Sequence, residues 1–173
     1  MGPVLRVVHG VDRVLRLALD TFTIVMAGTL LVLLNYAVFA RFVLNASVSW
    51  SEELPAHCLA ALTFIGAAYL VRTNEHLGFD SAARMLSPLL QRIVMAVNLI
   101  LMAAFGGLLA YYGFLAAVSF GGRLMMSVDL PMALFRGAMP LGGALIALFC
   151  TVRLVGLVTG HVDPDDLLPE SDA

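Results

Sequence analysis

Four long stretches of the chain contain no charged residue and are almost entirely apolar. They cover residues 21–40, 54–71, 93–122 and 137–152, and the last can be extended from Pro131 to beyond Arg153. A helix of about 20 apolar residues is long enough to cross the hydrocarbon core of a bilayer. The pattern therefore predicts an all-α integral membrane bundle of four transmembrane helices, with spans at about 19–40, 52–72, 89–120 and 131–158.

The segment before the first span alternates polar and apolar residues with helical periodicity. Its polar residues recur at steps of three and four, and leucine, valine and alanine occupy the opposite side; the polar set is Arg6, His9, Arg13, Arg16 and Asp20. This pattern is typical of an amphipathic helix in the headgroup layer, so we expect an interfacial helix at 4–18. A plain N-terminal extension of the first span is the alternative.

These elements place residues 1–160 in a single membrane domain. The remaining segment, 161–173, is acidic and contains two prolines, a composition that predicts a disordered tail.

The composition agrees with a membrane protein and disfavours several chemistries. The chain is 61% hydrophobic and 13% charged, whereas soluble domains contain about 25% charged residues. It has no basic patch interleaved with aromatic residues, so we expect no nucleic acid partner. Cys58 and Cys150 are isolated and form no CxxC motif. With no histidine pair for a haem and no glycine-rich phosphate loop, we expect no cofactor, no metal site and no enzymatic activity, and a membrane redox enzyme is disfavoured.

The arginines predict the orientation of the bundle. Cytoplasmic segments of membrane proteins carry an excess of basic residues. With the N-terminus inside, seven arginines lie on the inner side and three on the outer side, the latter being Arg41, Arg123 and Arg136. We therefore expect a multi-pass membrane protein with both termini cytoplasmic.

The outer end of the second span begins with a Ser-x-x-Glu sequence. Ser49 and Glu52 have the spacing of a capping box, and Trp50 suits the aromatic belt at a membrane surface. Glu53 is not needed for the cap. We expect it to pair with an arginine, either Arg41 or one on another subunit.

The inner end of this span carries charged residues spaced four apart: Arg72, His76, Asp80 and Arg84. On a continuous helix they would form an ionic stripe. Because Gly78 weakens such a helix, Asp80 can instead cap a short helix at 81–86. A solvated turn without specific function is the alternative to both. Ser87 and Pro88 then predict the N-cap and first residue of the third span.

The last two spans are rich in paired small residues: Ala103/Gly107, Gly106/Ala110, Ala138/Gly142 and Gly143/Ala147. Such pairs permit close helix approach, and we expect most of them to serve packing within the bundle, with contact to a second protein as the alternative. Pro131 and Pro140 predict a break or kink at the start of the fourth helix. His57 lies near a helix end, where a hydrogen bond to a neighbour is a more common role than proton transfer.

These motifs together resemble the small membrane subunit, the Q-type component, of tripartite ATP-independent periplasmic (TRAP) transporters. The resemblance covers most of the chain. It depends on Arg41, Asn45-Ala46-Ser47, Ser49-Trp50-Ser51-Glu52-Glu53-Leu54, Phe64-Ile65-Gly66-Ala67-Ala68, Arg72, Glu75-His76-Leu77 and Asp80, with a weaker match at Pro131-Met132 and Met139-Pro140-Leu141-Gly142. The chain departs from the family pattern at Pro55, Ala56, Ala61 and Arg136.

The resemblance implies a scaffold subunit of the bacterial or archaeal cytoplasmic (inner) membrane that braces a large elevator-type membrane subunit. The implied transporter is sodium-driven and imports a carboxylate-bearing solute, which a periplasmic substrate-binding protein delivers. The implied partners are that large subunit, the binding protein and membrane lipids. The candidate contact or structural residues are Arg41, Ser49, Trp50, Glu52, Glu53, Arg72, His76 and Asp80. A stand-alone small four-helix membrane transporter is the alternative function.

Overall fold

The protein is a bundle of long helices without sheet in the part of the chain that the structure describes. The structure is a computed structural model that describes residues 3–73 and 87–159, with side chains from Arg13 onward. Its helices are α1 (Pro3–Phe42), α2 (Glu53–Thr73), α4 (Pro88–Phe120), the short α5 (Ala133–Arg136) and α6 (Ala138–Thr159). Four segments of these helices are long and apolar enough to span a membrane. The predicted all-α class with four membrane-spanning helices is confirmed.

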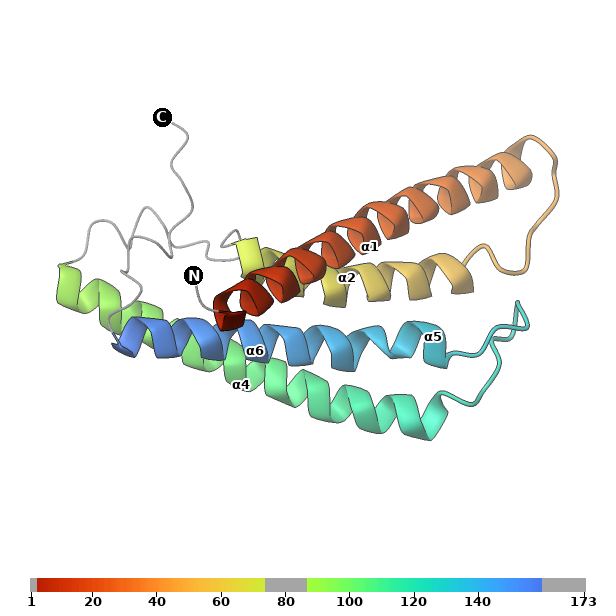
Figure 1. The fold of residues 1–173 in the computed structure, drawn as a ribbon. Coiled ribbons are helices and arrows are strands. Elements are labelled where there is room, and N and C mark those ends of the chain that lie inside the picture. The colour runs from red at the N-terminus through yellow and green to blue at the C-terminus, as the bar shows by residue number, and fades with distance from the viewer. Residues whose placement is uncertain (1–2, 74–86, 160–173) are drawn as a thin grey trace, which may run out of the picture.

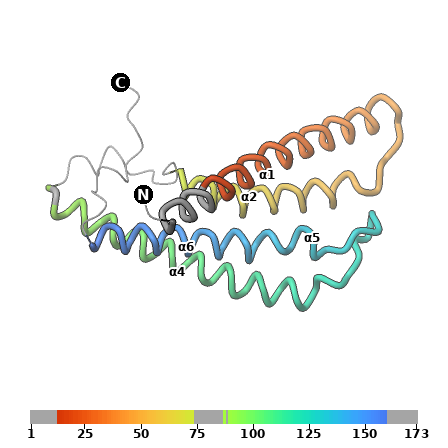
Figure 2. Tube along the Cα trace, viewed as in Figure 1, coloured from red at the N-terminus to blue at the C-terminus, as the bar shows by residue number. Residues whose placement is uncertain are grey.

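The helices follow one another across the bundle in the order α1, α2, α6, α4 (Figure 1). The contact between α4 and α6 is the most extensive, and α1 contacts chiefly α2. The loops at 43–52 and 121–132 lie together at one end, here called the hairpin end (Figure 2). Residues 73, 87 and 159 lie toward the opposite end, here called the terminal end.

The first helix is longer than the predicted first span. Residues 3–42 form one continuous helix, so the segment 4–18 is continuous with the span, as in the alternative stated above. The helix ends where Asn45 adopts a left-handed conformation with φ of 49°, which asparagine tolerates better than most residues. The amide of Ala46 then donates to the carbonyl of Ala40 at 3.0 Å.

Glycines allow α4 and α6 to approach closely. A Cβ atom on Gly143 would lie 2.6 Å from the Ala110 nitrogen and 2.7 Å from the Gly106 oxygen. A Cβ on Gly142 would lie 2.4 Å from the carbonyl oxygen of Phe64 on α2. These approaches are only possible without a side chain, which supports internal packing as their role. Gly107 differs, because nothing lies within 4 Å of the position that a Cβ would take there.

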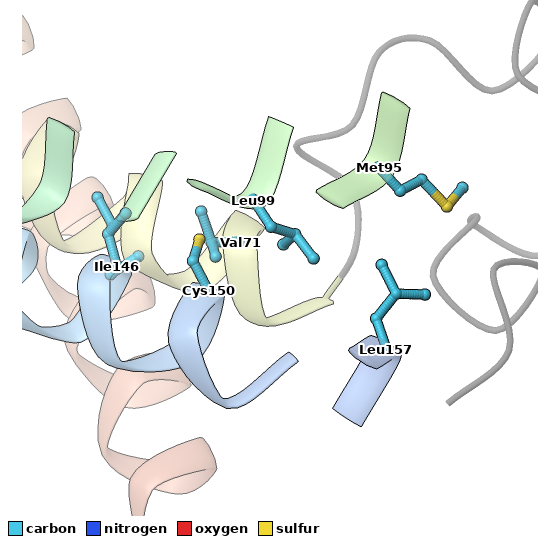
Figure 3. Close-up of a cluster of buried hydrophobic side chains, with 7 residues drawn as sticks. Val71, Met95, Leu99, Ile146, Cys150 and Leu157 are labelled. Atoms are coloured by element: carbon cyan, nitrogen blue, oxygen red, sulfur yellow. The ribbon is translucent and has the colours of Figure 1, made fainter. Parts of the chain in front are cut away.

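The hydrophobic core lies between α2, α4 and α6 toward the terminal end. Figure 3 shows its members, which are Ala68, Val71, Met95, Leu99, Ile146, Cys150 and Leu157. A second buried cluster joins Leu19 of α1 to Ala61 and Ile65 of α2 and to Ala138 of α6. Outside these contacts α1 is largely exposed, with many apolar side chains on its surface.

The two proline predictions agree with the helix bounds. Ser87 is the N-cap of α4 and Pro88 its first residue. The fourth span is interrupted at Gly137, between α5 and α6. Pro140 has no N–H to donate to the carbonyl of Arg136 one turn earlier, which explains the break at this point.

Candidate functional site

The carboxylate of Glu53, at the start of α2, binds the loop at 121–132. It accepts hydrogen bonds from the backbone N–H of Met126 at 3.2 Å, from the backbone N–H of Ser127 at 2.8 Å, and from the Ser127 hydroxyl. Glu53 thus has a partner within its own chain, and that partner is not an arginine. No pair between Glu53 and Arg41 forms in the described structure, and pairing with an arginine of another subunit stays a prediction.

The loop that Glu53 holds is itself ordered by backbone hydrogen bonds. Leu124 and Pro131 form an isolated antiparallel bridge, and the N–H of Met125 donates to the carbonyl of Leu130 at 3.0 Å. Met125 is buried at its base, whereas the neighbouring Met126 is 98% exposed. The hydrogen bonds from Met126 and Ser127 to Glu53, here called the Glu53 clamp, therefore fix a small hairpin that projects from the bundle.

Two aromatic stacks lie near the same end. Trp50 stacks on Tyr36 of α1, with ring centroids 5.8 Å apart and planes at 15°. His57 of α2 stacks on Phe135 of α5, with centroids 5.7 Å apart. The contact of His57 is thus with an aromatic neighbour that links α2 to the fourth span.

The other predicted residues of the outer loop are exposed. The side chains of Arg41, Ser49 and Glu52 all lie on the surface of the chain. The predicted capping box between Ser49 and Glu52 does not form in the described structure, because α2 begins only at Glu53. The Ser51 hydroxyl instead donates to the carbonyl of Val48 at 2.7 Å.

At the terminal end, two arginines bind the last carbonyls of neighbouring helices. Arg153 of α6 donates through both terminal guanidinium nitrogens, to the carbonyls of Val71 and Arg72 at the end of α2. Arg92 of α4 donates to the carbonyl of Leu157, near the end of α6, at 2.6 Å. Carbonyls in the last helical turn have no partner within their own helix, and a cation there also interacts favourably with the helix dipole.

Arg92 of α4 thus caps the end of α6, and Arg153 of α6 caps the end of α2. Arg72 is partly buried, and its backbone takes part through its carbonyl. The other predicted residues of this turn, His76 and Asp80, and the predicted short helix and acidic tail lie outside the described residues.

Sequence reasoning missed Ser127 and the capping roles of Arg92 and Arg153. Ser127 lies more than 70 residues from Glu53, and no local pattern connects them. For Arg153, one usable signal was its position inside an otherwise apolar helix, where a charge needs a partner.

The described interior offers no grouping suited to a metal ion. No three histidine, cysteine, aspartate or glutamate side chains gather among the described residues. Cys58 and Cys150 are both buried as free thiols, and Cys150 belongs to the core cluster. The polar contacts of the described chain instead lie mainly at its two ends, where they fix loops and helix termini.

A comparison with known protein families identifies the family of this chain. The profile of the family described as "Tripartite ATP-independent periplasmic transporters, DctQ component" matches residues 30–160. The match begins within α1 and extends to the end of α6, so it covers most of the chain and all the contacts described at both ends. A comparison with curated proteins finds no match. The chain is a multi-pass membrane protein that belongs to the DctQ family of small TRAP transporter subunits.

Proposed function

We propose that this chain is a rigid scaffold that braces the large, elevator-type subunit of a sodium-driven TRAP transporter. The transporter imports a carboxylate-bearing solute that a periplasmic binding protein delivers. One observation carries the scaffold role: three charged side chains, Glu53, Arg92 and Arg153, tie structural elements together. Glu53 joins the start of α2 to the loop at 121–132, and Arg92 and Arg153 join three helices.

The exposure of α1 supports a partner beside the bundle. The part of α1 that is apolar enough to span a membrane buries few of its residues within the chain. Its exposed side chains include Leu31, Val32, Val38 and Phe39. An apolar face of a membrane-spanning helix can contact either lipid or a second membrane protein, and a large subunit that packs against this face would move along a fixed surface.

The hairpin end is proposed to face outward and the terminal end the cytoplasm. The described residues of the terminal end include Arg13, Arg16, Arg72, Arg92 and Arg153. The described part of the hairpin end has only Arg41, Arg123 and Arg136. By the positive-inside rule, the end with more arginines faces the cytoplasm. The Glu53-held hairpin would then be accessible to the periplasmic binding protein.

The substitution Glu53→Gln tests the role of the hairpin. The amide group of glutamine keeps one oxygen but presents an N–H₂ group to the donors of Met126 and Ser127, so we expect the loop to loosen. Amide hydrogen exchange at 124–131 should become several-fold faster. Uptake by proteoliposomes that contain this chain, the large subunit and the binding protein should fall, while co-purification with the large subunit persists.

Glu52→Gln is the matched control, because Glu52 is the adjacent, exposed carboxylate. It should leave both hydrogen exchange and uptake unchanged. Normal uptake by the Glu53→Gln complex despite a loosened hairpin would show that the rigid hairpin has no part in transport. Uptake by the purified chain alone would contradict the scaffold role itself.

A further inference from the structure

Two arginines at the hairpin end are held on one aromatic ring. The guanidinium carbon of Arg123 lies 5.2 Å from the centroid of the Phe120 ring, and that of Arg136 lies 5.3 Å from the same centroid. A guanidinium stacks on an aromatic ring through its face. Its N–H donors lie in its plane and point away from it, so stacking leaves them available for hydrogen bonds.

The backbone brings the two arginines together. The carbonyl of Arg123 accepts from the N–H of Met132 at 3.0 Å, and the carbonyl of Gly121 accepts from the N–H of Ala133 at 3.2 Å. A side chain on Gly121 would press on Ala133, since its Cβ would lie 3.2 Å from that residue's Cβ. The end of α4 and the start of the fourth span are thus fixed against each other.

Neither of these two positive charges is neutralised by a carboxylate within the described chain. Within residues 13–73 and 87–159, the contacts of both guanidinium groups are those with Phe120, and neither donates to a carboxylate. Guanidinium groups whose donors are not taken up by the described chain are suited to the oxygens of a phosphate group. Their position on a preformed ring lowers the entropy lost on binding.

The surroundings indicate that this phosphate belongs to a lipid. Phe120 ends the third membrane-spanning segment, and its side chain is 41% exposed. Leu124 and Leu134, close in sequence to the two arginines, are 57% and 65% exposed. A site with cationic donors beside exposed apolar side chains at the end of a span matches an amphiphile, with its phosphate at the interface and its acyl chains in the bilayer.

We propose that Arg123 and Arg136, held by Phe120, form a binding site for the phosphate of an anionic phospholipid. The site is distinct from the Glu53 clamp, and it does not depend on the transported solute. Arg136 is also a departure from the family pattern, so the site is inferred for this chain from its own contacts.

Native mass spectrometry of the purified full chain tests this site. Equal amounts of phosphatidylglycerol and phosphatidylcholine are supplied in the micelle. The wild-type chain should retain one phosphatidylglycerol in preference to phosphatidylcholine, and Arg136→Gln and Arg123→Gln should each abolish the preference. Phe120→Leu keeps both charges but removes the stacking, and it should weaken retention by about three-fold.

Arg41→Gln is the control, because Arg41 is an exposed arginine at the end of α1 with no aromatic contact among the described residues. It should leave lipid retention unchanged, and circular dichroism should show that all variants remain helical. The proposal fails if Arg136→Gln retains the lipid, or if Arg41→Gln loses it to the same extent. It also fails if inorganic phosphate alone displaces the lipid, or if Arg136→Gln weakens only the contact with the binding protein.

Discussion

Replacing Arg153 with alanine should destabilise the bundle by about 3 kcal/mol, since two charge-assisted hydrogen bonds are lost together. Arg153 binds the carbonyls of Val71 and Arg72, and without it these oxygens would lose their donor at the end of a membrane-spanning helix. The free energy of unfolding can be measured by titrating the protein in mild detergent with sodium dodecyl sulfate. Hydrogen exchange should quicken in the last turn of α2.

Two further variants separate the contribution of the Arg153 hydrogen bonds to stability from the effect of removing any positive charge. Arg153→Lys keeps the charge but lacks the planar fork that reaches two carbonyls, so it should recover only part of the lost stability. Arg16→Ala removes an exposed arginine of α1 and should change stability by no more than about 0.5 kcal/mol. Equal effects of Arg153→Ala and Arg16→Ala would mean that the cap contributes nothing.

Replacing Gly142 with alanine should cost about 2 kcal/mol through overpacking. The added Cβ would lie 2.4 Å from the oxygen and 2.7 Å from the carbonyl carbon of Phe64. These are backbone atoms, so no side chain can rotate away and α2 and α6 must separate. The same detergent titration measures the loss, and weaker co-purification with the large subunit should accompany it if the bundle acts as a fixed surface for that subunit.

Gly107→Ala is the matched control for this effect. Gly107 also lies inside a membrane-spanning helix, but nothing lies within 4 Å of the position of its Cβ. Because alanine is a better helix former than glycine, this variant should be as stable as the original protein or slightly more stable. A comparable loss in both variants would show that glycine itself, rather than close approach, is required.

The sequence was sufficient to predict the elements that depend on local pattern. Charge-free windows gave four spans, because the bilayer demands continuous apolar length. Ser87 and Pro88 gave the start of α4, because the restriction on proline is local. The small-residue pairs predicted close packing of helices, and Gly106 and Gly143 occupy that contact.

The contacts at the two ends depend on positions far apart in sequence. The partner of Glu53 is a loop 73 residues away, and periodicity carries no information about which loops meet. The same limit applies to Arg153, which reaches a helix end 81 residues earlier. A charged side chain inside an apolar stretch indicates that a partner exists, but packing decides which partner it is.

The capping-box prediction failed for a related reason. The spacing of Ser49 and Glu52 fits the motif, but the chain must first turn back from α1 through Asn45. Within that turn the residue that donates a side-chain hydrogen bond is Ser51. A local motif was therefore overridden by the path that connects two spans.

The series of arginine caps has a consequence for the order in which the protein is made. The carbonyls at the end of α2 receive their donor from Arg153, which the ribosome adds some 80 residues later. During synthesis, the contact between α2 and α6 at these carbonyls can therefore form only after the last span has been made. Arg92 is made before α6, so the carbonyl of Leu157 finds its donor already present. Once α6 is in place, its Arg153 can bind the carbonyls at the end of α2. Insertion of the final span is thus the step at which both arginine caps form.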